Sequence, residues 1–470
     1  MQDGRYFYLV GKPASSELKA GVRNPFNGEM VAEVCQANAE QVERAIAGMV
    51  EAYAELRRWP SWRRTKACEH VHRRLIERAK EFARTIALEA GKPIKTARGE
   101  VARAITTFKL AAEEATRIVG EQLPVDIDER GTGYHAVVER VPIGPASFFT
   151  PYNFPLNLVA HKVGPAMACG CPFIVKPSER TPLTALLLGE LLAETEFPAG
   201  SWSVLPCDRQ TSRPLVTDER IKVFSFTGSP EVGWKLKAAA GKKAIVLELG
   251  NNSAVIVEGD ANVAEAVKRI VPAAFGYAGQ SCISVQRIYL HASIATEATR
   301  QLVEATQKLK VGDPLDEATD VGPMIDEAAA ARLESWIAES GGEVLYGGSR
   351  KGTMFEPTLV RGVQAGSKLG CEEAFGPVAI LETYSDFDDV LRQVNATRYG
   401  LQAGIFTRNL FKVRQAFETL DVGGLVVNDV PTTRIDNMPY GGVKDSGIGR
   451  EGVRYAMEHF LERKVMLTRF

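Results

Sequence analysis

Hydrophobic residues recur at two different spacings along the chain, and the change falls near residue 142. Before it, Ala-, Glu- and Arg-rich segments carry apolar residues at helical spacing, which predicts helices over 38–57 and 61–88 and a mostly helical N-terminal region. Beyond it, short apolar runs alternate with helical segments. The runs that predict strands cover 146–150, 172–177, 202–206, 223–228 and 244–249, and the intervening helices cover 182–196 and 230–240. This alternation is typical of parallel strands joined by helical crossovers, so we expect an α/β fold with a doubly wound sheet.

The alternation starts again after Gly250, which predicts a second doubly wound α/β domain. Its expected strands cover 253–257, 286–291 and 377–384, and a helix covers 261–278. Two runs of strand composition, 121–127 and 134–144, surround a polar turn and predict a hairpin. The chain ends in a further β-prone run, 464–470. Because unpaired edge strands commonly need a cover, we expect these strands to form a small extension that serves oligomerisation.

Composition narrows the classes of partner. The 57 Lys and Arg residues nearly balance the 58 Asp and Glu residues, so we expect no nucleic-acid partner. The N-terminus lacks the pattern of a secretory signal, and no apolar run approaches the roughly 18 to 20 residues of a membrane span, so we expect no membrane association. Seven scattered cysteines fit reduced thiols and a cytoplasmic location. Cys169 and Cys171 have no second pair of ligands nearby, and we expect no metal site.

Cys282 and Glu248 combine chemical reactivity with positions at the ends of expected elements. Cys282, in GYAGQSCISVQRI, lies between a helix and a strand, where a nucleophilic thiol would be accessible. Taken alone, a cysteine among small residues is more often an inert core thiol. Glu248 ends an apolar strand, at the edge where α/β sheets bind ligands. A strand-end Glu that turns into solvent explains this segment equally well.

Three further segments present polar groups at strand ends. In TPYNFPLN, prolines on both sides of Asn153 fix the backbone, as an oxyanion-hole amide requires, although a helix-capping Asn is the alternative. The segment FTGSPEVG at 226–233 joins a strand, a glycine turn and a helix start, an arrangement that presents N–H groups to phosphate. In VKPSE, Lys176 and Glu179 leave a strand towards the same edge, where a solvated charge pair is an equal alternative.

Three sequence markers occur in order further along the chain: LELG at 247–250, GQSC at 279–282 and EEAFGPV at 372–378. Together with RNPFNGEMVAEV at 23–34 and PYGGVKDSGIGREG at 439–452, they make the chain resemble the aldehyde dehydrogenase superfamily over essentially its whole length. The resemblance implies oxidation of a small-molecule aldehyde to its carboxylic acid with NAD(P).

The resemblance also implies a role for each matching residue. Cys282 matches the nucleophile that attacks the aldehyde carbon, and Asn153, with the backbone N–H of Cys282, matches the oxyanion hole. Glu248 matches the base that activates water to hydrolyse the thioester. The positions that match the cofactor site are Lys176, Glu179, Thr227, Gly228, Ser229, Glu373 and Phe375.

Within that site, the adenosine ribose would lie against Lys176 and Glu179, the pyrophosphate at Ser229, and the nicotinamide half near Glu373 and Phe375. We expect NAD to be preferred, because the Glu179 carboxylate would accept ribose hydroxyls and repel a 2′-phosphate. NADP stays the alternative, since Lys176 and the neighbouring Arg180 offer compensating charge.

The domain organisation follows from the same resemblance. Residues 1–120 and 141–247 would form the cofactor-binding domain, and residues 248–450 the catalytic domain. Residues 121–140 and 451–470 would bridge subunits in a homodimer or homotetramer.

The chain departs from common family patterns at four positions. Asn251 and Asn252 follow Gly250 where a glycine is common, and Asn tolerates left-handed backbone better than most residues. Tyr152 stands where Trp or Phe is frequent and Tyr440 where Phe is frequent, and the two hydroxyls indicate a polar substrate.

Two arginines indicate the substrate's charge. Arg103, in GEVARAITTFKLAAEEA, and Arg434, in NDVPTTRIDNMPYGG, lie in segments that border the family's substrate tunnel. A guanidinium binds carboxylate or phosphate in a bidentate fashion, so we expect an anionic aldehyde such as a semialdehyde or a phosphorylated triose. Taken singly, each arginine could instead be a surface or ion-paired residue.

Two other functions compete with this one. A CoA-acylating dehydrogenase would resolve the thioester with a thiol, and Glu248 argues against it. A non-catalytic protein could keep the fold without the chemistry. Loss of Cys282 or Asn153 would favour that reading, and both residues are present.

Overall fold

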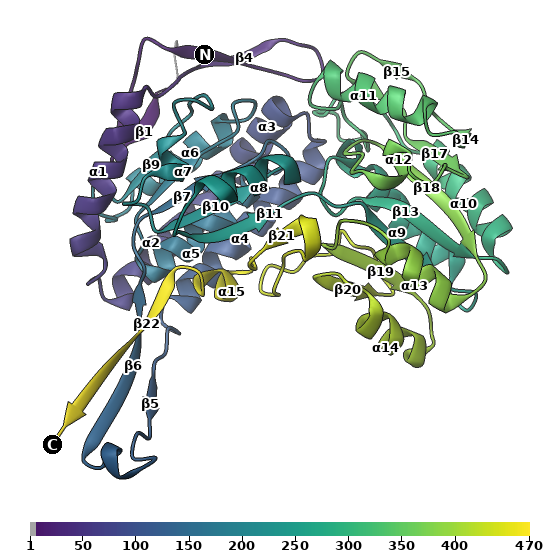
Figure 1. Cartoon of the computed structure of the whole chain (residues 1–470). Coiled ribbons are helices and arrows are strands. Elements are labelled where there is room, and N and C mark those ends of the chain that lie inside the picture. Colours follow the sequence, from purple (N-terminus) through teal and green to yellow (C-terminus); the bar gives the residue numbers. More distant parts are fainter. Residues whose placement is uncertain (1–5) are drawn as a thin grey trace.

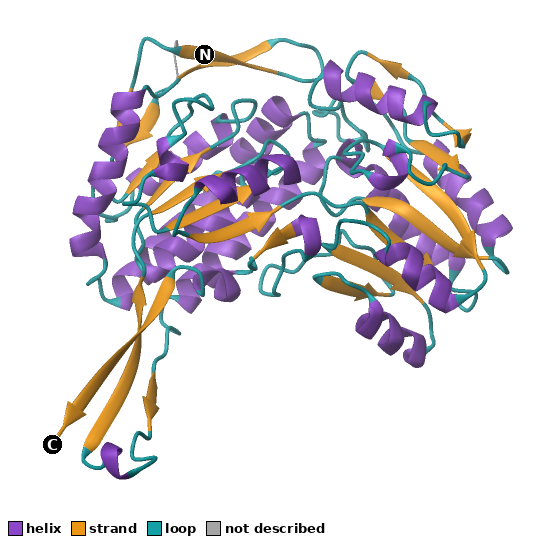
Figure 2. Ribbon diagram, in the orientation of Figure 1, coloured by secondary structure: helices purple, strands orange, loops and turns teal. Residues whose placement is uncertain are grey.

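The computed structural model describes residues 6–470. Two α/β bodies lie side by side, and a narrow arm of strands projects from the first of them (Figure 1). Helices cover the faces of both main sheets (Figure 2), so the doubly wound α/β fold with a small β extension is as predicted. In the described part of the chain, no helix is long and apolar enough to cross a membrane.

The first sheet has eight strands. Their spatial order is β2 (Lys12–Ala14), β1 (Phe7–Leu9), β9 (Trp202–Val204), β8 (Phe173–Lys176), β7 (Ala146–Phe149), β10 (Val223–Thr227), β11 (Ala244–Glu248) and β21 (Gly447–Ile448). The central five, from β9 to β11, run parallel, and their apolar sequences suit strands covered on both faces. The helices of this body are α1 (Ala39–Leu56), α2 (Ser61–Glu77), α3 (Ala79–Ala90), α4 (Ile94–Glu114), α5 (Asn157–Cys169), α6 (Leu183–Ala193), α7 (Pro214–Thr217), α8 (Pro230–Ala239) and α15 (Val453–Met457).

The second sheet has seven strands. Their order is β14 (Glu343–Tyr346), β17 (Thr358–Arg361), β18 (Val378–Tyr384), β13 (Val285–His291), β12 (Ser253–Val257), β19 (Gln402–Phe406) and β20 (Gly424–Val427). Only β14 pairs antiparallel within this sheet. The helices of this body are α9 (Val263–Phe275), α10 (Ala295–Gln307), α11 (Glu327–Ala338), α12 (Lys368–Cys371), α13 (Phe387–Asn395) and α14 (Leu410–Thr419), and a small hairpin joins β15 (Arg350–Lys351) to β16 (Met354–Phe355).

Two antiparallel units lie outside the main sheets. The arm consists of β5 (Glu121–Leu123), β6 (Tyr134–Pro142) and β22 (Leu461–Arg469), so the predicted hairpin gains the C-terminal strand as a third member. The hairpin of β3 (Lys19–Arg23) and β4 (Met30–Cys35) crosses from the first body to the second (Figure 1). There the Thr353 hydroxyl donates to the carbonyl of Pro25. The predicted domain boundaries and the homodimer or homotetramer stay predictions.

The N-terminal region is mostly helical as expected, but four short strands before α1 were missed and two expected helices had wrong bounds. Of these strands, β1 pairs with β2 and with the distant β9, and β3 pairs with β4. The helix expected over 61–88 breaks at Arg78, which pairs with Glu81 and with Glu190 on α6. The helix expected over 261–278 ends at Phe275, because Tyr277 and Ala278 adopt left-handed backbone with φ of 54° and 51°.

A buried ion pair joins the helical layer to the loops that follow the sheet. The ammonium of Lys92, just before α4, contacts the carboxylate of Glu100, and both side chains are buried. Glu100 Oε1 accepts the backbone N–H groups of Leu156 and Asn157 at 2.9 and 3.1 Å, which ties the start of α5. Lys92 Nζ also lies 3.6 Å from the ring centre of Phe154. The pair therefore holds the loop between β7 and α5 in place.

Removing one partner of this ion pair should destabilise the folded protein. We expect Lys92→Met to lower the free energy of unfolding by about 3 to 5 kcal/mol, because the Glu100 carboxylate would stay buried without its counter-ion. Lys95→Met is the matched control, since its pair with Asp320 is largely exposed and should contribute about 1 kcal/mol or less. Urea unfolding followed by fluorescence measures both, and equal losses in the two variants would contradict the role of the buried pair.

Candidate active site

A cavity of about 610 Å³ lies beyond the carboxyl end of β11. The predicted site residues that line it are Arg103, Tyr152, Asn153, Thr227, Gly228, Ser229, Glu248, Cys282, Glu373, Phe375 and Arg434. The other two, Lys176 and Glu179, line a second cavity of about 610 Å³. The two cavities share Pro151, Tyr152, Thr227 and Gly228 as wall residues. The structure thus brings residues from both halves of the chain to adjoining spaces at one sheet edge.

Cys282 follows a strained turn and is partly exposed to the first cavity. The left-handed residues Tyr277 and Ala278 are followed by Gly279 at φ 65°, where a side chain would collide with the carbonyl of Gly376. The sulfur lies 3.2 Å from the hydroxyl oxygen of Tyr440. Burial raises the pKa of the Cys282 thiol to about 12, and the Tyr440 hydrogen bond acts in the opposite direction.

Glu248 is a buried carboxyl at the end of β11. Neither of its carboxyl oxygens has a hydrogen-bond partner among residues 6–470. Burial, and next the negative charge of Glu451, raise the pKa of Glu248 well above its usual value, while Arg434 and Lys162 oppose the shift. A raised pKa makes the carboxylate a stronger base, which suits a general base. Because Glu248 is buried, the alternative that this side chain turns into solvent is excluded.

Asn153 is buried on the loop that Glu100 holds. Its Nδ2 donates to the backbone carbonyl of Gln280 at 3.0 Å, two residues before Cys282. Its Oδ1 is buried without a hydrogen-bond partner in the described chain. The amide is therefore held beside the backbone of the cysteine loop and does not cap α5.

The turn after β11 is shaped by Glu373. The backbone N–H of Asn251 donates to Glu373 Oε1 at 2.9 Å, and a Cβ added to Gly250 would lie 2.5 Å from Glu373 Oε2. Neither Asn251 nor Asn252 adopts left-handed backbone, so the expected reason for tolerating asparagine there was wrong. Instead, the Asn251 amide donates to Ser253 Oγ at 2.6 Å.

Thr227 and Gly228 form the wall between the two cavities. The Thr227 hydroxyl oxygen is buried and has no hydrogen-bond partner among residues 6–470. A Cβ on Gly228 would lie 2.4 Å from the ring of Phe226, so a side chain here would require that ring to move. Ser229 is the N-cap residue of α8 and makes no side-chain capping bond. A ligand at this wall would therefore meet the buried hydroxyl of Thr227 and could come close to the backbone of Gly228.

The second cavity carries more positive charge than the sequence indicated. Lys176 Nζ lies 3.4 Å from Glu179 Oε1 and Arg180 pairs with Asp326. Arg209 and Arg213 also line the cavity. Sequence reasoning missed these two because they lie in the irregular segment between β9 and α7, where a charged residue usually faces solvent.

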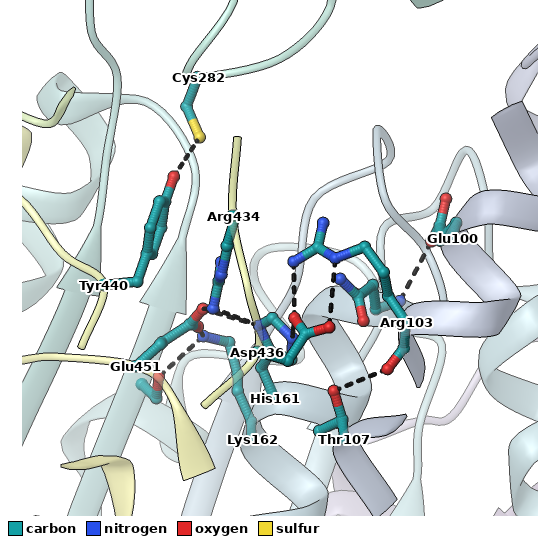
Figure 3. Close-up of polar contacts among 12 residues, drawn as sticks. Glu100, Arg103, Thr107, His161, Lys162, Cys282, Arg434, Asp436, Tyr440 and Glu451 are labelled. Atoms are coloured by element: carbon teal, nitrogen blue, oxygen red, sulfur yellow. Dashed lines mark hydrogen bonds and ion pairs between the residues drawn. The ribbon is translucent and has the colours of Figure 1, made fainter. Parts of the chain in front are cut away.

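Arg434 and Arg103 both line the first cavity and are both ion-paired. Arg434 Nη2 donates to His161 Nδ1 at 2.6 Å and to Glu451 Oε2 at 3.0 Å, while its buried Nε has no partner in the described chain. Arg103 Nη2 lies 2.8 Å from Asp436 Oδ1. Each arginine therefore combines the two roles that the sequence left open (Figure 3).

A buried network behind these arginines escaped the sequence analysis. Lys162 Nζ donates to Glu451 Oε1 at 3.0 Å, and His161 Nε2 lies 3.1 Å from Asp436 Oδ1 (Figure 3). Since Arg434 only donates, His161 Nδ1 is the acceptor and the Nε2 hydrogen points to Asp436. Although burial acts to raise it, the positive charges of Lys162 and Arg434 hold the pKa of Glu451 well below its usual value. The sequence signal that could have revealed this network is the pair of basic residues His161 and Lys162 in the largely apolar segment 157–169.

Comparisons with known proteins identify relatives of this chain. The family model described as "Aldehyde dehydrogenase family" matches residues 13–466. A 3-sulfolactaldehyde dehydrogenase of Priestia aryabhattai is 41% identical over 464 residues, covering 98% of this chain and 97% of the relative. The crystal structure of aldehyde dehydrogenase 21 from Physcomitrella patens, in complex with the reaction product succinate, has a TM-score of 0.98 and 45% identity over 100% of this chain and 99% of that one. Glyceraldehyde-3-phosphate dehydrogenase GapN from Methanocaldococcus jannaschii, complexed with NADP, has a TM-score of 0.93 and 36% identity over 97% of this chain and 100% of that one. The chain belongs to the aldehyde dehydrogenase family.

Proposed function

We propose that this aldehyde dehydrogenase oxidises a small anionic aldehyde to its carboxylic acid with NAD(P). Cys282 is the nucleophile and Glu248 activates the hydrolytic water. The observation that carries the proposal is the pairing, in one cavity, of a partly exposed thiol with a buried carboxyl that has no hydrogen-bond partner among residues 6–470. A buried carboxyl without a partner is costly, so it is retained where it has a chemical task.

In the first half of the reaction, the sulfur of Cys282 bonds to the aldehyde carbon and the thiol loses its proton. The aldehyde oxygen then carries negative charge, which hydrogen-bond donors fixed in place would stabilise. The backbone N–H of Cys282 and the amide of Asn153 supply those donors. The hydrogen bond from the Asn153 amide to the Gln280 carbonyl supports the role of Asn153, because it keeps the amide beside the loop that carries Cys282.

In the second half, water attacks the thioester carbon and the carbon–sulfur bond breaks, which releases the acid and restores the thiol. Glu248 accepts the proton from the attacking water. Its burial and raised pKa support this role, since a carboxylate with a raised pKa is a stronger base. The presence of this carboxyl favours hydrolysis over transfer to CoA.

The residues around the shared wall fit NAD(P). A buried Thr227 hydroxyl without a partner in the described chain, and a Gly228 turn that carries no side chain, suit a closely bound phosphate linkage. When bound, NAD(P) would supply the oxidant: it would take up, as hydride, the hydrogen on the carbon that is bonded to the Cys282 sulfur, which leaves the thioester. We propose that Ser229 lies at the pyrophosphate, Lys176 and Glu179 at the adenosine ribose, and Glu373 with Phe375 at the nicotinamide half.

The preference for NAD stays a prediction from Glu179, and Arg209 and Arg213 on the same cavity offer charge to a 2′-phosphate. The NADP complex of the GapN relative supports NADP as the alternative cofactor.

The two arginines support an anionic substrate. The buried Nε of Arg434 has no partner among residues 6–470, so the guanidinium keeps a hydrogen-bond donor for a ligand in spite of its ion pair. Arg103 lies on the same cavity. The relatives point the same way, because 3-sulfolactaldehyde and succinate both carry negative charge. A carboxylate or sulfonate at the far end of the aldehyde would suit these donors.

The nucleophile is tested by Cys282→Ala. We expect turnover to be abolished while the fold and cofactor binding persist, because only the covalent step needs the sulfur. Absorbance of the reduced cofactor follows turnover, and protein fluorescence follows cofactor binding. Cys371→Ala is the control, since Cys371 is exposed and does not line the cavity. Turnover by Cys282→Ala within about tenfold of the native enzyme would refute the assignment.

Glu248→Gln should separate the two halves of the reaction. We expect one rapid burst of reduced cofactor followed by little steady-state turnover, because hydride transfer does not need the carboxylate but hydrolysis does. In the native enzyme the steady-state rate should rise with pH through the raised pKa of Glu248, since only the deprotonated carboxyl accepts a proton from water. Stopped-flow absorbance measures both phases. Equal loss of burst and steady state would place Glu248 in an earlier step.

Substrate charge is tested by Arg434→Ala, alone and combined with Arg103→Ala. We expect the KM for succinate semialdehyde to rise by about 10- to 100-fold in the single variant, the usual effect of losing a hydrogen bond to a charged group. Pentanal, a neutral aldehyde of similar length, is the control substrate for the same variants. An unchanged ratio of kcat/KM between the two aldehydes in the double variant would rule out anion recognition by these arginines.

A further inference from the structure

The hydroxyl of Tyr440 is the structural feature of the site that the reaction above does not use. It lies 3.2 Å from the sulfur of Cys282, and that sulfur has no other hydrogen-bond partner among residues 6–470. Tyr440 is only 4% exposed, so little water competes for the contact. Figure 3 shows the ring directed at the cysteine, with Arg434 alongside it.

The surroundings of Tyr440 hold its ring in one place. Its backbone exchanges two hydrogen bonds with Glu451, at 3.0 and 2.6 Å. The guanidinium carbon of Arg434 lies 3.8 Å from the ring centre, and Arg434 is itself bound to Glu451. On its apolar side the ring packs with Ile283 and Leu401. The hydroxyl is therefore fixed at the sulfur by the same buried network that orients Arg434.

The contact between hydroxyl and sulfur favours one charge state of the cysteine. When the sulfur is protonated, either atom can donate, and hydrogen bonds that involve a thiol are weak. When the sulfur is a thiolate, only the phenol can donate, and a hydrogen bond to an anion is considerably stronger. The positive charge of Arg434 beside the ring acts in the same direction. Burial raises the pKa of Tyr440 well above its usual value, so the phenol keeps the proton that it donates.

We propose that Tyr440 is a further catalytic residue, whose hydroxyl donates a hydrogen bond to the thiolate of Cys282 and thereby promotes formation of the nucleophile. The phenol keeps its proton, and the thiol proton leaves to a base or to water. Once the sulfur has bonded to the aldehyde carbon, it is a poor acceptor and this stabilisation ends. Tyr440 thus acts on the attack and not on the hydrolysis. The inference rests on the proposed role of Cys282.

The test compares the native full-length enzyme with Tyr440→Phe, which removes only the hydroxyl and keeps the ring beside Arg434. Each is treated with iodoacetamide over a range of pH, without cofactor or aldehyde, and alkylation of the Cys282 peptide is followed by mass spectrometry. We expect the apparent pKa for alkylation of Cys282 to rise by about one unit in Tyr440→Phe, the shift that corresponds to one lost hydrogen bond to an anion. Below that pKa, the alkylation rate at a given pH should fall by about tenfold.

Two references keep the result specific. The exposed Cys371 in the same molecule should react at the same rate in both proteins, and a change there would reveal a general disturbance. Tyr53→Phe is the control variant. It removes a hydroxyl of α1 that donates to the carbonyl of Pro142, and it should leave the pH profile of Cys282 alkylation unchanged.

Superimposable Cys282 profiles in native enzyme and Tyr440→Phe would overturn the proposal. That failure is distinct from a failure of the proposed function, which appears as turnover by Cys282→Ala. A second readout separates a catalytic role from a structural one. Tyr440→Phe should slow the burst of reduced cofactor and leave the rate of thioester hydrolysis unchanged. A burst as fast as that of the native enzyme would count against the proposal as well.

Discussion

Most of the site depends on the buried ion pair between Lys92 and Glu100, because this pair contacts the loop of Asn153 and the loop that leads to Cys282. Glu100 ties the start of α5, and with it the loop of Asn153. Lys92 lies against Phe154 on that loop and, 4.5 Å from its ring centre, against Tyr277 on the cysteine loop. Tyr277 is left-handed, and its hydroxyl donates to the carbonyl of Ala90. Packing of this kind can offset the strain of such a backbone, which otherwise costs about 1 to 3 kcal/mol.

A second buried cluster, around Glu451, sets the electrostatics of the cavity. Glu451 is ionised and compensated by Lys162 and Arg434, whereas Glu248 has no hydrogen-bond partner in the described chain and is destabilised as an anion by the neighbouring negative charge. Two carboxyls in one protein interior thus have pKa values shifted in opposite directions, the arrangement that distinguishes an acid from a base among like groups. The same Glu451 orients Arg434, and through it the ring of Tyr440. Glu451 therefore links the Glu248 carboxyl, the Arg434 guanidinium and the ring of Tyr440.

The sequence predicted those parts of the fold that local patterns encode. Apolar runs such as 223–228 and 244–249 gave the parallel strands, and the ends of those strands led to Glu248. It did not reveal the N-terminal strands, which are short and of which only β1 has a distant partner. It also did not reveal the end of α9 at Phe275, where contacts with Ala90 and Lys92 override the helical pattern. The Glu451 network was also missed, because His161 and Glu451 lie 290 positions apart and only the folded chain brings them together. Local pattern finds elements and motifs, while the pairing of buried charges is a property of the tertiary structure.

The central claim is that the reaction passes through a covalent bond to Cys282. The most direct measurement is rapid acid quenching of the native enzyme during turnover of succinate semialdehyde with NADP or NAD, followed by peptide mass spectrometry. The account predicts that the peptide containing Cys282 gains the mass of the succinyl group, in an amount that rises and falls with the burst of reduced cofactor. Formation of reduced cofactor with no adduct on Cys282, or with the adduct on another cysteine, would contradict it.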